Sequence, residues 1–205
     1  MSFTRRLLLG AGAVTVLGAS TLGLGWWRVD GPGAIRPASA TDPALPLPLD
    51  EMDVVLTDHR GNRVAIPDWV GQPTLVFFGF THCPEVCPTT LSDISLWLEE
   101  LGPEADRLNV ALITVDPERD TADALAEYLT YFDPRIIGYS GRPDEIAAAA
   151  TAFRVRYEKR PLGDNYSMDH TSGVFLFHPD GRFGGIIDFH EDRTFAVPKI
   201  RRILT

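Results

Sequence analysis

Apolar residues between positions 50 and 205 fall into short runs and helical repeats that alternate along the chain. Leu75 to Phe80 is a continuous apolar run, which is typical of a strand buried on both faces of a sheet. Leucine and isoleucine then recur at helical spacing from Leu91 to Leu101, after a proline and two threonines suited to a first turn. Gly102-Pro103 ends this pattern, so the sequence predicts a buried strand followed directly by a helix.

Further apolar segments continue the alternation to the end of the chain. They predict a hairpin of strands at 54–57 and 63–66, strands at 110–115, 136–139, 174–177 and 183–187, and helices at 121–132, 144–153 and 195–204. The residues from Glu158 to Asn165 are interpreted as a polar loop. Strands that alternate with helices favour the α/β class, with a mixed sheet that carries an antiparallel hairpin at one side.

The N-terminal segment has a different composition. Arg5 and Arg6 precede Leu7 to Trp27, an uncharged stretch long enough to span a bilayer core of ~30 Å as a helix. Residues 1–30 are therefore expected to be a membrane anchor that holds the rest of the chain on the periplasmic side of a bacterial-type inner membrane. A cleaved export signal is the alternative, because Ala38-Ser39-Ala40 fits a small-residue cleavage site. Residues 31–49, rich in Pro, Ala and Gly, are expected to link the anchor to a domain at 50–205.

Length and charge narrow the classes of partner. A chain of 205 residues with 44% hydrophobic content can form one domain of roughly 100–200 residues and a short appendage. The formal net charge is −9, and no stripe of lysine and arginine runs through residues 50–205. Nucleic acid is therefore not an expected partner.

The chain has two cysteines, Cys83 and Cys87, in a turn between the first buried strand and the following helix. A helix N-terminus favours thiolate over thiol, so both side chains are expected to be reactive. Their spacing brings the sulfur atoms close enough for a redox-active disulfide or for one soft metal ion. A purely structural disulfide is the third possibility, although such a small loop would stabilise little.

A third ligand candidate precedes the strand expected at 174–177. In a thioredoxin-like arrangement the residue before that strand faces the cysteine turn, which would bring His170 to Cys83 and Cys87. Two sulfur atoms and one nitrogen suit Cu(I) and can also hold Cu(II). Zinc is chemically possible, but a structural zinc site normally has four ligands.

Three segments together resemble the SCO/SenC family: 79–88 (GFTHCPEVCP), 115–121 (VDPERDT) and 166–171 (YSMDHT). They occur in the family's order and at similar spacing, and the resemblance covers about residues 50–205. It implies a thioredoxin-like domain on an N-terminal membrane anchor, with Cys83, Cys87 and His170 as copper ligands. It also implies a role in assembling the binuclear copper site of cytochrome c oxidase subunit II. The chain departs from the family at Ala122, where relatives often carry proline.

Neighbouring residues have two interpretations each. Asp116 can orient His170 or a partner from behind the ligands, or it can be a turn or N-cap aspartate before Pro117. Asp169 has the same supporting role as one possibility and simple solvation as the other. Met168 offers a thioether suited to Cu(I), although a methionine beside aromatic residues commonly serves packing. His82 is expected to tune the thiolates or meet a partner and not to bind the metal.

Three functional hypotheses follow. The first is a membrane-tethered copper chaperone, not an enzyme, that delivers copper to subunit II or a similar acceptor and is loaded by a copper donor protein. The second is an extracytoplasmic thiol-disulfide oxidoreductase that prepares the acceptor's cysteines and is recycled by a thiol reductant, with Cys83 or Cys87 as the attacking residue. The third is a thiol peroxidase, which the Cys83-Pro84 sequence and a second cysteine four residues on disfavour.

Overall fold

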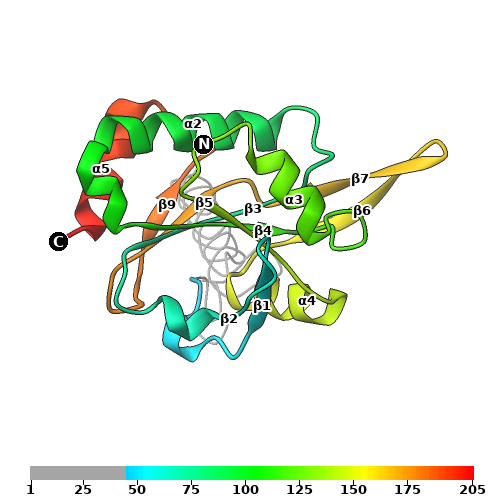
Figure 1. The fold of residues 1–205 in the computed structure, drawn as a ribbon, viewed down its shortest axis with the longest axis horizontal. Helices are drawn as coiled ribbons and strands as arrows, with labels where there is room; N and C mark the ends of the chain where they lie inside the picture. The colour runs from blue at the N-terminus through cyan, green and yellow to red at the C-terminus, as the bar shows by residue number, and fades with distance from the viewer. Residues whose placement is uncertain (1–44) are drawn as a thin grey trace, which may run out of the picture. The chain divides into compact units, whose positions relative to one another are not determined.

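The structure, a computed structural model, describes residues 45–205. Within these residues, seven strands form a central sheet (Figure 1). The anchor expected at residues 1–30 and most of the expected linker lie outside the described residues. From residue 45 onward, no helix is both long and apolar enough to cross a membrane. Leu49, at the end of the expected linker, is fully buried in the core of the domain.

The sheet is mixed, as the sequence predicts. In spatial order its strands are β2 (Arg63–Ala65), β1 (Val55–Asp58), β5 (Ile136–Ser140), β4 (Asn109–Thr114), β3 (Thr74–Gly79), β8 (Val174–Phe177) and β9 (Phe183–Ile187). The three central strands β5, β4 and β3 are parallel. β1 and β8 pair antiparallel to this central group, and β2 and β9 pair antiparallel to β1 and β8. Every residue of β3 is buried, as expected for a strand covered on both faces.

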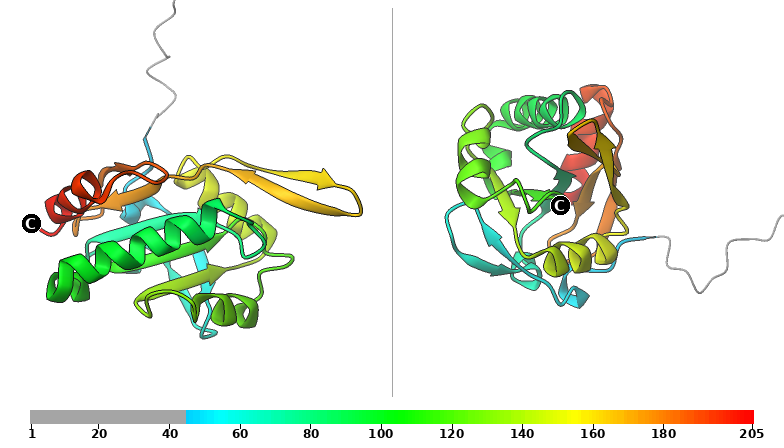
Figure 2. Two further views of the ribbon diagram at one scale, coloured as in Figure 1. Left: turned by 90° about the horizontal axis from the view of Figure 1, so that it is seen from above. Right: turned by 90° about the vertical axis from the view of Figure 1, so that its right-hand side faces the viewer.

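Helices cover both faces of the sheet (Figures 1 and 2). One face carries α2 (Val86–Leu101), α3 (Ala122–Leu129) and α5 (Arg193–Ile203), and the other carries α4 (Pro143–Ala152). Short 3-10 helices are η1 (Leu49–Glu51), η2 (Ile66–Trp69) and η3 (Gly102–Arg107). α2 begins at Val86, two residues before the start that the sequence predicts at Pro88. Pro88 is tolerated as the third residue of the helix, because N–H groups in the first turn have no partner inside the helix.

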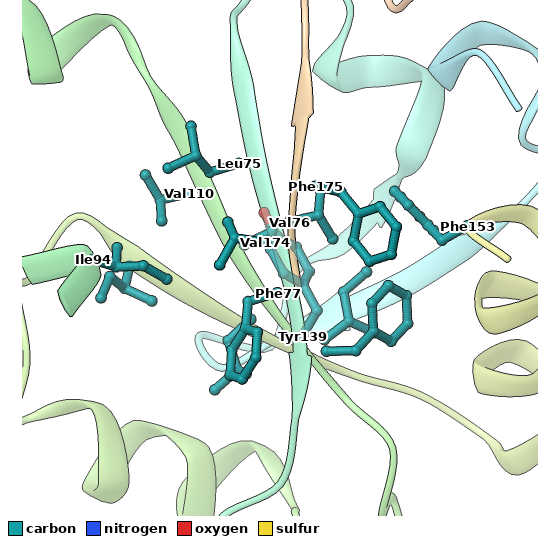
Figure 3. Packing of buried hydrophobic residues seen from close by; sticks show 14 of the residues in the cluster. Leu75, Val76, Phe77, Ile94, Val110, Tyr139, Phe153, Val174 and Phe175 are labelled. Atoms are coloured by element: carbon teal, nitrogen blue, oxygen red, sulfur yellow. The ribbon is translucent and has the colours of Figure 1, made fainter. Parts of the chain in front are cut away.

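The hydrophobic core lies on both sides of β3. Leu75 and Phe77 point to the side of Ile94 on α2, whereas Phe175 of β8 lies on the side of Phe153, which follows α4 (Figure 3). The rings of Phe153 and Phe175 meet edge to face at 62°, with centroids 6.3 Å apart. This packing fixes the carboxyl end of β3, from which the cysteine turn leaves.

A second, two-stranded sheet replaces the polar loop expected at 158–165. β6 (Tyr157–Leu162) and β7 (Asn165–His170) pair antiparallel along their whole length and project from the body of the domain (Figure 2). Gly163 opens the two-residue turn with φ +59°, a conformation that favours glycine. The interpretation of this segment as a loop was wrong. Its strands are held together by backbone pairing, and β6 is mostly exposed, so it lacks the apolar residues that mark a buried strand in the sequence.

Candidate metal centre

The cysteine turn joins the carboxyl end of β3 to the first turn of α2. Cys87 is the second residue of α2 and is fully buried, whereas Cys83 lies before the helix and is partly exposed. Glu85 at the N-cap makes no side-chain capping bond, and the Cys87 N–H donates instead to Cys83 Sγ at 3.3 Å. The sulfur of Cys83 therefore satisfies a backbone donor that the helix leaves free. Both cysteines are free thiols in the structure.

The pKa values of the two thiols are shifted in opposite directions. A hydrogen bond from the Cys87 thiol, supported by the backbone N–H groups of Cys87 and Glu85, holds the pKa of Cys83 far below its ordinary 9.0. The same hydrogen bond, together with burial, raises the pKa of Cys87. Cys83 is thus the thiolate of the pair, and Cys87 is the buried thiol that donates to it.

His170 ends β7 and brings its ring to the cysteines. Its Nε2 lies 3.5 Å from Cys87 Sγ. Its Nδ1 lies 2.9 Å from the Thr171 carbonyl oxygen, which only accepts, so Nδ1 carries the proton. In the neutral ring Nε2 then keeps a free lone pair on the side of the sulfur atoms, which is the form that binds metals. Edge contacts with Phe77 and Phe80 fix the ring plane.

The three predicted ligands are brought together in pairs. Cys83 Sγ accepts from the Cys87 N–H at 3.3 Å, and His170 Nε2 lies 3.5 Å from Cys87 Sγ. Among residues 45–205, however, no group of three His, Cys, Asp or Glu side chains already stands in a metal-ligating arrangement. The two sulfur atoms and the imidazole are therefore neighbours and not yet a closed coordination shell.

Asp116 and Asp169, expected as possible supports for His170, have other partners. Asp116 follows β4, is buried, accepts from Tyr166 Oη at 2.8 Å and forms an ion pair with Arg119 Nε. Asp169 is exposed and pairs with Arg160 at 2.8 Å on the outer face of the hairpin. The partner of the His170 Nδ1–H is a backbone carbonyl, a support that residue types alone do not reveal.

Met168 and His82 lie where their simpler interpretations place them. Met168 is buried within the hydrophobic core cluster. His82 is exposed, and its Nδ1 lies 3.0 Å from Thr81 Oγ1. Their possible roles toward a metal remain predictions.

Asp120 is a buried residue of the site that sequence reasoning missed. Its carboxylate accepts from Thr81 Oγ1 at 2.6 Å, from the Thr81 N–H at 3.1 Å and from Thr114 Oγ1 at 2.5 Å. Burial raises the pKa of Asp120, and these hydrogen bonds oppose the rise. The carboxylate ties the cysteine turn to the end of β4. Thr81 beside the cysteines and a second aspartate after Asp116 are the only sequence signals for this link.

The fold and the site define a class of protein: a thioredoxin-like α/β domain that carries a dithiol and an imidazole at the carboxyl edge of its parallel strands. Residues 51–205 match the model of the SCO1/SenC family. The chain belongs to the SCO1/SenC family.

Individual relatives agree with this assignment. The chain is 39% identical over 132 residues to human protein SCO1 homolog, mitochondrial, covering 62% of this chain and 44% of the relative. It is 34% identical over 149 residues to protein SCO1, mitochondrial, of Saccharomyces cerevisiae, covering 71% and 50%. The chain thus spans about half the length of the curated relatives it matches.

Solved structures extend the likeness to the whole domain. The structure of Bradyrhizobium japonicum ScoI with copper bound matches with a TM-score of 0.70 and 42% identity, over 78% of this chain and 99% of that one. The crystal structure of yeast Sco1 with copper bound matches with a TM-score of 0.69 and 33% identity, over 78% and 88%.

Proposed function

We propose that this chain is a copper-binding assembly factor for cytochrome c oxidase, in which Cys83, Cys87 and His170 hold copper as cargo. The observation that carries the proposal is the meeting of two sulfur atoms and an imidazole with a free Nε2 lone pair at one edge of the sheet. Thiolates favour Cu(I), and imidazole accommodates either copper oxidation state. The two copper-bound relatives described above support the choice of metal.

Exposure suggests the order in which ligands are exchanged. Cys83 and His170 are partly exposed, whereas Cys87 is fully buried under the turn. Incoming ligands of an acceptor would therefore replace Cys83 and His170 first and Cys87 last. Because the three side chains do not yet form a closed shell, copper entry also requires them to draw together.

The proposed acceptor is subunit II of cytochrome c oxidase, and a copper donor protein would load the chain. Residues 1–30 would anchor the chain in a bacterial-type inner membrane, with residues 50–205 on the periplasmic side. Tethering would raise the concentration of the copper site near a membrane-bound acceptor.

Anaerobic titration of the reduced full chain with Cu(I) tests the copper site. The parent is expected to bind one copper, Cys83→Ser to lose stable binding, and His170→Ala to retain copper poorly while still forming the disulfide. His190→Ala is the matched control, since His190 is an exposed histidine paired with Asp93. Equal binding by the parent and His170→Ala would remove His170 from the site.

A cellular test addresses the tether. An exported version without residues 1–40 is expected to support oxidase assembly less well than the full chain at low copper and matched expression. Full complementation by that version would contradict the tethering proposal. A mature N-terminus at Thr41 would identify the segment as a cleaved signal.

A thiol-disulfide reductase is the second candidate, and the contrast between the two thiols favours it specifically. The Cys83 thiolate would attack one sulfur of an acceptor disulfide and form a mixed disulfide with it, while the other acceptor sulfur leaves as a thiolate. Cys87, after losing its proton, would attack Cys83 Sγ and release the acceptor dithiol. The acceptor gains two electrons, and the Cys83–Cys87 disulfide then needs an external thiol reductant. Cys87→Ser should trap the mixed disulfide, and failure to trap it with a disulfide-containing acceptor would contradict this activity.

A further inference from the structure

The β6–β7 hairpin carries His170 yet stands outside the main sheet. Its two strands hydrogen-bond to each other and form a separate two-stranded sheet. An isolated hairpin is marginally stable in water, so its direction depends on how its base is held. Tyr166, Met168 and His170 share one face of β7, because alternate residues of a strand point the same way. The position of His170 therefore depends on what holds this face.

Tyr166 is held from three directions. The Arg119 guanidinium lies over its ring, with 3.7 Å between Cζ and the ring centroid. The Tyr166 hydroxyl donates to Asp116 Oδ1 at 2.8 Å, and the Tyr166 carbonyl accepts from Arg119 Nη1 at 3.1 Å. Arg119 Nε also pairs with Asp116, whose side chain is 1% exposed. One arginine and one buried aspartate thus fix the ring, the hydroxyl and the backbone of this residue.

The contacts continue on both sides of Tyr166. Lys159 Nζ lies 4.1 Å from the ring centroid and pairs with Glu118 at 2.8 Å. Arg119 Cζ in turn lies 6.0 Å from the ring centroid of Phe80, the first residue of the cysteine turn. The Phe80 ring meets the His170 ring edge-on, with centroids 5.8 Å apart. We call Lys159, Tyr166, Arg119, Phe80 and His170 the stacking column.

We propose that Arg119 and Tyr166 are positioning residues for the copper site, because they fix the hairpin against the cysteine turn and so set where His170 stands. The inference rests on the proposed function, since the quantity that they set is the reach of His170 to copper. Tyr166 precedes His170 by four residues, about 13 Å along a strand. A displacement of Tyr166 therefore moves the His170 imidazole as well, because both residues belong to the same paired strand. The contacts of Arg119 and Lys159 with the Tyr166 ring favour one orientation of the hairpin over others.

Two variants of the full chain remove the column in different ways. Tyr166→Leu deletes the ring and the hydroxyl, and Arg119→Lys keeps the charge beside Asp116 but loses the planar stack and the forked donors. Tyr166→Phe keeps the stack and loses only the hydroxyl bond, so it should behave more like the parent. Arg160→Gln is the matched control, because Arg160 lies on the same hairpin and pairs with the exposed Asp169.

Four readouts separate positioning from general stability. Extraction of copper by a chelator should be roughly 10–100-fold faster in Tyr166→Leu and Arg119→Lys, the range expected when a ligand loses its support. The nitrogen coupling in the Cu(II) electron paramagnetic resonance spectrum should weaken in the same variants. The reduction potential of the Cys83–Cys87 pair should change much less than copper retention, because the imidazole contacts the sulfur atoms but is not part of the disulfide. Amide hydrogen exchange across residues 165–170 of the metal-free chain should accelerate.

The outcomes distinguish the two proposals. Folded Tyr166→Leu and Arg119→Lys variants with the copper retention and nitrogen coupling of the parent would overturn the positioning role. An equal shift of copper retention and of the dithiol potential would also overturn it, because the variants would then act on the whole cysteine turn. If Tyr166→Leu does not fold, Arg119→Lys decides. A parent that binds no copper would overturn the proposed function. Hydrogen exchange of the metal-free chain would still test whether Arg119 and Tyr166 hold the hairpin in place.

Discussion

Gly79→Ala tests whether the end of β3 leaves room for the buried sulfur. A Cβ atom built at Gly79 would stand 2.9 Å from Phe77 Cε1, 3.1 Å from Cys87 Sγ and 3.2 Å from Leu112 Cδ1. All three side chains are buried in the core and have little room to move. The added methyl group therefore has to displace either the core or the Cys87 sulfur.

The sign of the effect follows from two opposing contributions. Exchanging glycine for alanine at an unstrained position favours folding by about 0.4–1 kcal/mol, because the unfolded chain loses freedom. Overpacking of a filled core costs about 1–3 kcal/mol. The cost is larger, so we expect a net loss of about 1–2 kcal/mol in the free energy of unfolding, or roughly 5–30-fold in the ratio of folded to unfolded chain.

Urea unfolding of the reduced chain measures this loss, and Cu(I) titration of the folded variant measures its effect on the site. Gly138→Ala is the control, because a Cβ there would stand 2.9 Å from Leu129 Cδ1 and 3.3 Å from Leu125 Cβ, on α3. Both variants should lose stability, and only Gly79→Ala should also weaken copper binding. Unchanged stability in Gly79→Ala, or equal copper binding by the two variants, would refute the reasoning.

Three further predictions concern the turn and its thiols. Asp120→Asn should lower the free energy of unfolding by about 1–3 kcal/mol, because Thr81 Oγ1 donates to one carboxylate oxygen and Thr114 Oγ1 to the other, and an NH2 group that cannot accept replaces one of these oxygens. Urea unfolding at pH 7 checks this, and unchanged stability would contradict it. Alkylation of Cys83 should stay fast at pH 6, where an ordinary thiol with pKa 9.0 is about one part in a thousand thiolate. In Cys87→Ala, the midpoint of the alkylation rate against pH should move to higher pH, because the hydrogen bond that stabilises the Cys83 thiolate is lost. Because the folded pKa of Cys83 is lowered, its contribution to stability is fully present above pH 9.0 and falls as pH drops toward the folded value. Urea denaturation of the parent and of Cys83→Ser at several pH values below 9.0, where Cys87 is protonated in both the folded and the unfolded chain, measures this fall, and the same pH dependence in both proteins would contradict it.

The central strands of the main sheet could be predicted because they are buried. β3 and β4 are apolar along their length, and burial leaves this signal in the sequence. The β6–β7 hairpin has no such signal, since all but the first residue of β6 is exposed and its strands carry charged side chains. Gly163-Asp164 was the available clue, a two-residue turn of the kind that closes hairpins.

The site divides in a similar way. Cys83, Cys87 and His170 could be named as candidate ligands because few residue types bind a soft metal and the chain has only two cysteines. The groups that hold them depend on contacts between distant segments. Thr81 and Asp120 are 39 positions apart, and Arg119 and Tyr166 are 47 positions apart. Such pairs have no periodicity, so they appear only when the chain is folded.

X-ray absorption at the copper edge of the full chain loaded with Cu(I) tests the central claim most directly. The account predicts a copper shell of two sulfur atoms and one imidazole nitrogen, with the nitrogen lost in His170→Ala and one sulfur lost in Cys83→Ser. A copper shell without sulfur, or a spectrum that His170→Ala leaves unchanged, would contradict it.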